Sequence, residues 1–95
     1  MAAPKGVTVN TGALIMIAQN DARTRITFQN NTGVAVFIGE TSGVTTANGY
    51  SLANNAEFTR ERTEENKDYF YSGDYYAIIA SGAQTLIVWE EEKIR

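Results

Sequence analysis

Short stretches rich in Val, Ile, Thr, Phe and Tyr alternate along this chain with clusters of Gly, Asn and Ser, about every eight to twelve residues. Within many stretches, apolar and polar positions alternate with a period of two, which places successive side chains on opposite faces of a strand. Regularly spaced short strands are typical of β-sandwiches and barrels. The pattern therefore predicts an all-β fold: a single antiparallel β-sandwich or jelly-roll-like barrel with little helix.

Two strands are predicted near the N-terminus, VTVN at 7–10 and GALIMIAQ at 12–19. In the second, Leu14 and Met16 share one face and Ile15 and Ile17 the other, so we expect both faces to be covered. A buried helix is the alternative for so short an apolar run, although its β-branched content favours a strand.

A central hairpin is predicted for residues 23–39. Ile26 and Phe28 point inward in the stretch RTRITFQN. The residues between and beside them are expected to point to water: Arg25, Thr27 and Gln29. A tight turn at 30–33 follows, where Gly33 can adopt a positive φ. The stretch VAVFIG then returns antiparallel, with Val34, Val36 and Ile38 on one face and Ala35 and Phe37 on the other.

Two more hairpins are predicted. In GVTTANGYSL, Asn48-Gly49 matches a two-residue turn between strands, with a surface recognition loop as the functional alternative. At the C-terminus, DYYAIIA and TLIVWEE flank SGAQ, and the last strand is apolar on both faces, so we expect it to be central.

Residues 57–70, EFTRERTEENKDYF, are the ambiguous segment. Like charges at i,i+4 and missing apolar periodicity argue against a long helix. We predict two polar strands joined by a loop at about 63–67, with a short helix as the alternative. The predicted core of the domain comprises Ile26, Phe28, Val36, Ile38, Ile78, Val88 and one of Ile87 or Trp89.

At 95 residues the chain is expected to form one domain, residues 1–95, with a short flexible N-terminal arm at about 1–6 and a charged C-terminal tail at about 91–95. It contains no Cys and no His, which excludes disulfides, thiolate metal sites and His-dependent nucleophilic catalysis. The net charge of -3 with dispersed Lys and Arg argues against nucleic acid as a partner, and the longest apolar run is too short to span a membrane. The start of the chain lacks an apolar signal-peptide segment, so synthesis in the host cytoplasm without secretion is expected.

Several carboxylates lie close together in sequence: Glu57, Glu61, Glu64, Glu65, Asp68 and Asp74. Paired carboxylates could hydrolyse a glycan or bind calcium, but these lie among basic residues and match no calcium-loop spacing. We interpret them as a solvated surface. We therefore predict no enzymatic activity, no cofactor and no metal site.

Arginine and aromatic side chains offer the other candidate contacts. Arg23 and Arg25 could pair with a partner's carboxylate, but an exposed edge position is the simpler explanation and the one we favour. The aromatic cluster comprises Tyr69, Phe70, Tyr71, Tyr75 and Tyr76. If these residues lie on strands, rings occur on both faces; tyrosines are common both at interfaces and in the cores of small sandwiches.

Taken together, ALIMIAQNDARTRITFQNNTGVAVFIG, GVTTANGYSL and DYYAIIASGAQTLIVWEE resemble small all-β virion proteins of tailed bacteriophages, the capsid decoration or cement proteins. The resemblance covers about residues 7–91, through turn-and-strand patterns of modest specificity. The segment TRERTEENKDYFYSGD is longer and more acidic than that family pattern.

The resemblance implies a structural protein of the virion that binds the outer capsid surface and stabilises capsomer contacts. Its expected partners are the major capsid protein and further copies of itself, as a dimer or trimer. We hypothesise that Tyr69, Tyr71, Arg60 and Arg62 belong to that contact. A tail-fibre or receptor-binding module that recognises a host surface carbohydrate is the alternative, and a small carbohydrate hydrolase is a third reading.

Overall fold

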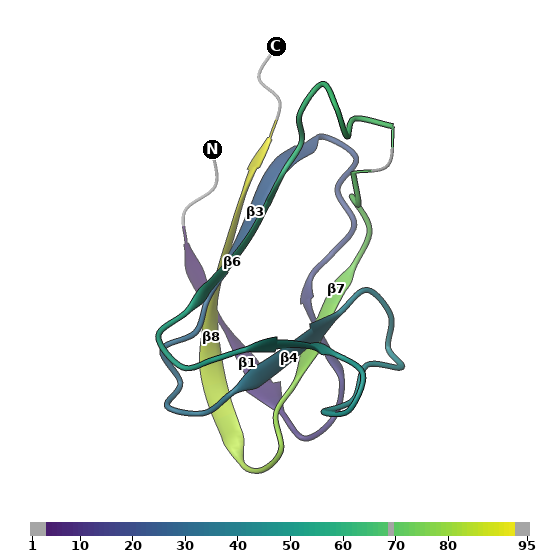
Figure 1. Ribbon diagram of the computed structural model, residues 1–95. Coiled ribbons are helices and arrows are strands. Elements are labelled where there is room, and N and C mark those ends of the chain that lie inside the picture. The colour runs from purple at the N-terminus through teal and green to yellow at the C-terminus, as the bar shows by residue number, and fades with distance from the viewer. Residues whose placement is uncertain (1–3, 69, 93–95) are drawn as a thin grey trace.

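The computed structural model describes residues 4–68 and 70–92. These residues form strands without any helix (Figure 1). The strands are β1 (Lys5–Asn10), β2 (Leu14–Ile17), β3 (Arg23–Gln29), β4 (Val36–Gly39), β5 (Tyr50–Leu52), β6 (Glu57–Glu61), β7 (Tyr75–Ile78) and β8 (Ala83–Glu92).

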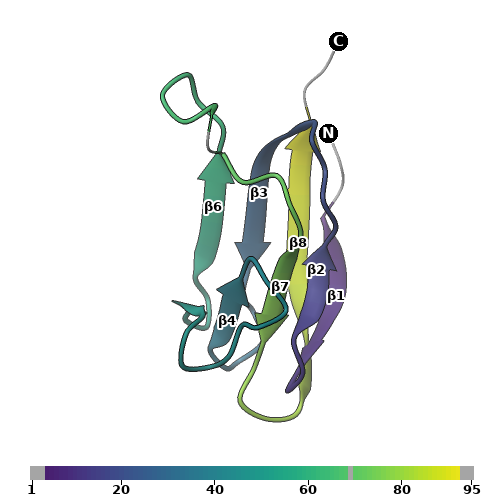
Figure 2. The ribbon, with the colours of Figure 1, turned by 90° about the vertical axis from the view of Figure 1, so that its right-hand side faces the viewer.

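The strands form two antiparallel sheets of four strands each, which we call sheet I and sheet II (Figure 2). Sheet I has the order β1-β8-β3-β6, and sheet II has the order β2-β7-β4-β5. Each sheet turns one apolar face to the other, and the buried side chains of both make a single core. The predicted all-β sandwich is confirmed, and β8 is a central strand as expected.

Two of the predicted hairpins are wrong, because the chain crosses between sheets where a tight return was expected. β3 lies in sheet I and β4 in sheet II. In the same way, β7 lies in sheet II and β8 in sheet I. Gly33 has a φ of 91° in the first crossing. The Asn30 amide is completely buried there, and its nitrogen donates to the carbonyls of Val34 and Leu52, each at 2.8 Å. A buried Asn thereby ties the end of β3 to sheet II.

β4 and β5 do pair with each other, but through residues 40–49 rather than through a two-residue Asn48-Gly49 turn. The Asn48 side chain closes this loop by accepting a hydrogen bond from the Thr45 N–H at 2.7 Å. Gly49 has no positive φ. A Cβ at Gly49 would lie 2.8 Å from Val44 and 2.9 Å from Phe37, so close packing explains the glycine.

The ambiguous polar segment contains one strand, β6, rather than two. Residues 62–68 form no strand, residues 64–68 form turns, and among the described residues strand structure resumes only at β7. The predicted second polar strand is therefore wrong for the described part of the segment, and the helical alternative is wrong there too. Tyr69 lies outside the described residues.

The core contains most of the residues predicted for it. Ile26, Phe28, Val36, Ile38 and Val88 are buried, as expected, and are joined by Val9, Met16, Ile17, Leu52, Phe58, Tyr75, Ala77, Ile79 and Leu86. Ile78 is only half-buried because the inward side of β7 and the residue after it carries Tyr75, Ala77 and Ile79. Ile87 and Trp89 are both half-buried on the outer side of β8, so the prediction that one of them is in the core is also wrong.

Two other sequence expectations need correction at the strands. β2 is an edge strand, and Ile15 is 49% exposed, so its two faces are not both covered. An irregularity between Ile15 and Ile17 lets Met16 and Ile17 both be buried. Thr27 was expected in water, but it is buried on the outer side of sheet I.

The expected terminal arm and tail overlap with paired strands. Lys5 and Gly6 belong to β1 and lie opposite Val88 and Ile87. At the other end, Glu91 lies opposite Arg25 within β8. Residues 1–3 and 93–95 lie outside the described residues.

Candidate binding surfaces

Arg23 is a structural residue and not an exposed edge arginine. It is completely buried, and β3 lies between β8 and β6 rather than at an edge. Its Nε is 2.8 Å from the Glu90 carboxylate. Its two terminal nitrogens donate to the carbonyls of Gly73 at 3.0 Å and Ala18 at 2.8 Å. Arg23 therefore joins sheet I to two connecting segments, whereas Arg25 is exposed on the outer face.

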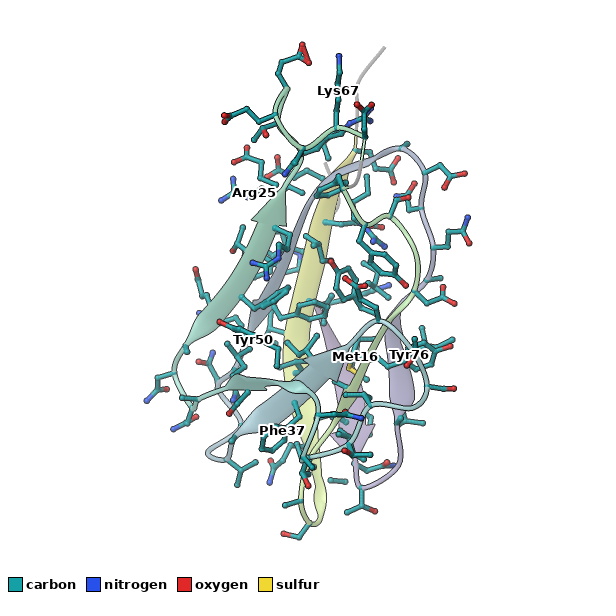
Figure 3. The ribbon with its side chains drawn as sticks, turned by 45° about the vertical axis from the view of Figure 1, so that its right-hand side comes forward. Met16, Arg25, Phe37, Tyr50, Lys67 and Tyr76 are labelled. Atoms are coloured by element: carbon teal, nitrogen blue, oxygen red, sulfur yellow. The ribbon has the colours of Figure 1, made fainter. Side chains whose placement is uncertain are left out.

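A continuous row of aromatic rings begins at the surface and enters the core. The ring centres of Tyr50 and Phe58 are 4.9 Å apart, and those of Phe58 and Tyr75 are 6.2 Å apart. Tyr71 packs edge-on against Tyr75 with 5.1 Å between the ring centres. Tyr75 within the row is 2% exposed. Tyr50 at one end is 53% exposed (labelled in Figure 3), and Tyr71 at the other end is half-buried.

An open cleft lies beside this row, between β6 of sheet I and the β4–β5–β7 side of sheet II. It consists of two adjoining hollows of about 280 and 230 Å³ that share Glu40, Arg60 and Tyr75. We call it the inter-sheet cleft. Its lining residues are Ile38, Gly39, Glu40, Tyr50, Phe58, Arg60, Asn66, Phe70, Tyr71 and Tyr75.

The inter-sheet cleft holds one acidic and one basic side chain. Arg60 lies opposite the buried Ile26 in the register of β6 and β3, so its side chain is on the inward side of sheet I. Its guanidinium carbon stands 4.6 Å from the centre of the Phe58 ring. Glu40 is exposed and directly follows β4. Within the described residues, neither Glu40 nor Arg60 has an ion-pair partner within 4.0 Å.

The two tyrosines at the base of the cleft differ in their hydroxyl contacts. The Tyr71 hydroxyl lies within hydrogen-bond distance of the carbonyls of Glu40, at 3.0 Å, and Asp74, at 2.6 Å. The Tyr75 hydroxyl makes no hydrogen bond with any described residue. It is not a buried unpaired group, because every buried side-chain polar atom of the described residues has a partner. Burial raises the pKa of both phenols above the usual value of 10.0, and the nearby Glu40 charge raises both further.

These raised pKa values predict a loss of stability in alkali. Below pH 10 the stability of the folded state is unaffected by these groups, because both tyrosines are protonated in the folded and in the unfolded protein. Above pH 10 the unfolded chain releases these protons more readily than the native protein. Urea-unfolding midpoints should therefore fall as the pH rises from 10 through the native pKa values.

Phenylalanine variants separate the contributions of the two tyrosines. Tyr75→Phe should flatten the alkaline decline at little cost near neutral pH, because its hydroxyl has no hydrogen bond to lose among the described residues. Tyr71→Phe should cost about 1 kcal/mol at neutral pH, because its two carbonyl contacts are lost. An unchanged alkaline decline in both variants would contradict the assignment.

The structure brings together two of the four residues hypothesised as a contact. Arg60 and Tyr71 both line the inter-sheet cleft. Arg62 does not line this cleft. Its backbone N–H donates to the Thr24 carbonyl at 2.8 Å, and Arg62 lines a different hollow together with Lys67. Tyr69 lies outside the described residues, so its place in the contact stays a prediction.

The expected alternation of aromatic faces holds on β7 but not before it. Tyr75 points inward, and Tyr76 is half-buried on the outer face. Residues 70–74 form no strand, and Phe70 and Tyr71 line the same cleft instead of facing opposite ways. Sequence reasoning missed Tyr50 and Glu40 because they flank the long loop that was expected to be strand and turn.

The acidic residues singled out in the sequence are dispersed. Those of β6 and the following turns are exposed: Glu57, Glu61, Glu64, Glu65 and Asp68. Glu64 is 3.6 Å from Lys67, and Asp74 accepts a hydrogen bond from the Gln19 N–H at 2.6 Å. Across residues 4–68 and 70–92, no three acidic side chains converge on a point where a metal ion could bind.

A second surface of interest is the outer face of sheet II, which carries apolar side chains toward solvent. Ile15 lies opposite Tyr76, and Phe37 lies opposite Ile78. Phe37 and Tyr76 are labelled in Figure 3. The loop after β4 places the Val44 side chain over Gly39, so that a Cβ atom on Gly39 would lie only 2.7 Å from Val44. Val44 itself is buried, and we call the group of Ile15, Phe37, Tyr76 and Ile78 the sheet II patch. Its most exposed member is Ile15.

Comparison with models of protein families, with curated proteins and with solved structures finds no match to this chain. Among the described residues, no helix is long and apolar enough to cross a membrane.

Proposed function

We propose that this protein is a structural component of a phage virion that binds the outer surface of the assembled capsid and stabilises contacts between capsomers. The sheet II patch is the observation that supports a binding role most directly. Contiguous apolar surface often marks an interaction site, and here Ile15, which is 49% exposed, lies beside three half-buried apolar side chains. This proposal also rests on the resemblance of the whole strand-and-turn pattern to capsid decoration proteins.

The sheet II patch suits attachment to a repeated protein lattice. Its residues lie on paired strands, so little conformational entropy is lost when it docks. Weak contacts multiply when several copies of the protein, as a dimer or trimer, bind neighbouring sites. In this proposal the patch replaces Tyr71 as the centre of the contact, because the Tyr71 hydroxyl already contacts two carbonyls inside the domain.

A lysine at the most exposed apolar position should weaken capsid binding. We expect Ile15→Lys to reduce the affinity for assembled capsids of the encoding phage at least about tenfold, because a charge would replace a buried interface side chain. The measurement is co-sedimentation of the purified protein with expanded, emptied capsids. Ile15 lies on an edge strand, so the folded state should tolerate the change.

Thr8→Lys is the matched control, because Thr8 is an exposed residue on β1, the edge strand of the other sheet. It should bind capsids like the unmodified protein. Equal binding by both variants would move the contact away from the sheet II patch. Binding to host cells, with no binding to capsids, would reject the proposal in favour of a receptor-binding module.

A further inference from the structure

The inter-sheet cleft combines aromatic rings with three polar groups of different hydrogen-bonding character. Glu40 provides acceptors, Arg60 provides donors, and the Tyr75 hydroxyl can do both. Tyr75 lines both hollows, and its hydroxyl has no hydrogen-bond partner among the described residues. Because no buried side-chain polar atom of the described residues lacks a partner, this hydroxyl is open to the cleft although the residue as a whole is 98% buried. A hydroxyl that faces an open cleft is hydrogen-bonded to water, and a ligand hydroxyl can take the place of that water.

We propose that the inter-sheet cleft binds the ring of a neutral sugar. The apolar C–H face of a pyranose would pack on the exposed ring of Tyr50, while its hydroxyls would donate to Glu40 and accept from Arg60. The stack of Arg60 on Phe58 holds the guanidinium in place before the ligand arrives. The proposal does not depend on capsid binding, which involves a different surface.

Charge selects a neutral ligand over an ionic one. A phosphate or carboxylate would meet the unpaired Glu40 carboxylate, and a basic side chain would meet the unpaired Arg60 guanidinium. Adjacent hydroxyl groups satisfy both side chains, since each hydroxyl can donate and accept. The cleft is therefore complementary to a polyhydroxylated ring that carries no net charge.

The size of the cleft fits a small ligand. Its hollows of about 280 and 230 Å³ lie at or below the lower end of the range for small-molecule sites, roughly 300 to 1,000 Å³. One or two sugar rings match this volume. For a ligand of that size bound in an open cleft, we expect a dissociation constant of about 1 mM.

Amide nitrogen–proton spectra of the whole chain, titrated separately with glucose, galactose, mannose and N-acetylglucosamine, test the proposal. At least one sugar should shift the amide signals of Gly39, Arg60 and Tyr75 in a saturable manner. Tyr50→Ala and Glu40→Gln should each raise its dissociation constant at least about tenfold. Both residues are exposed, so folding should be unaffected by either change.

Glu57→Gln is the charge-matched control, because Glu57 lies on β6 but is exposed on the outer side of sheet I. It should bind the sugar as the unmodified protein does. The proposal is overturned if none of the four sugars shifts these signals, or if both cleft variants keep the original dissociation constant. Shifts of the same amides by a triarginine peptide, but by no sugar, would overturn it in favour of a basic protein segment.

Discussion

Glu90→Ala is expected to lower the free energy of unfolding by about 3 to 5 kcal/mol. The substitution would leave the completely buried Arg23 guanidinium without the carboxylate that lies 2.8 Å from its Nε. A buried charge without a counter-charge is among the costliest defects in a folded protein. For a domain of this size, whose total stability is on the order of 5 to 15 kcal/mol, the loss would unfold a measurable fraction of molecules.

Urea unfolding compares this variant with Glu91→Ala, the next residue along β8. Glu91 faces the outer side of sheet I opposite the exposed Arg25, so its loss should cost less than about 1 kcal/mol. The double variant Arg23→Met, Glu90→Met should recover part of the loss because it removes both charges together. Equal midpoints for Glu90→Ala and Glu91→Ala would contradict the structural role of the ion pair.

The position of Arg23 also shows where sequence periodicity stops being informative. Strict alternation along β3 places Arg23 on the same outward face as Arg25. The register with β8 shifts between these two residues, and the shift lets the Arg23 side chain reach Glu90 inside the domain. A local irregularity of this kind leaves no mark in the alternation of polar and apolar residues.

Strand positions were predictable from the sequence, but strand pairing was not. Alternation in RTRITFQN and in VAVFIG located β3 and β4, because one buried face of a strand leaves a local signal. Whether the chain then returns in the same sheet or crosses to the other depends on distant partners. The local sequence predicts a turn at Asn30, yet its buried side-chain amide donates a hydrogen bond to the Leu52 carbonyl, 22 residues away.

The candidate cleft was only half predictable for the same reason. Arg60 and Tyr71 were singled out for their residue types, and both line it. Glu40 and Tyr50 flank the loop between β4 and β5 and meet β6 only because the two sheets stack. A single Glu and a single Tyr in a turn-rich stretch carry no spacing signal that could have joined them to β6.

Phe28→Ala should also cost about 3 to 5 kcal/mol, and for a reason that involves both sheets. Phe28 is completely buried on β3 of sheet I. The centre of its ring lies 5.7 Å from the ring centre of Phe58 in the same sheet and 5.3 Å from that of Tyr75 in sheet II. Truncation would leave a cavity where these three rings meet and would remove an aromatic contact between the layers.

Phe28→Leu distinguishes lost volume from a general intolerance of change at this position. It keeps most of the apolar volume and should cost about 1 to 2 kcal/mol, measured as the shift in urea midpoint at constant slope. Because Tyr75 also forms part of the inter-sheet cleft, Phe28→Ala should in addition broaden or shift the amide signal of Tyr75 in molecules that remain folded. An unchanged midpoint for Phe28→Ala would contradict the placement of this ring between the sheets.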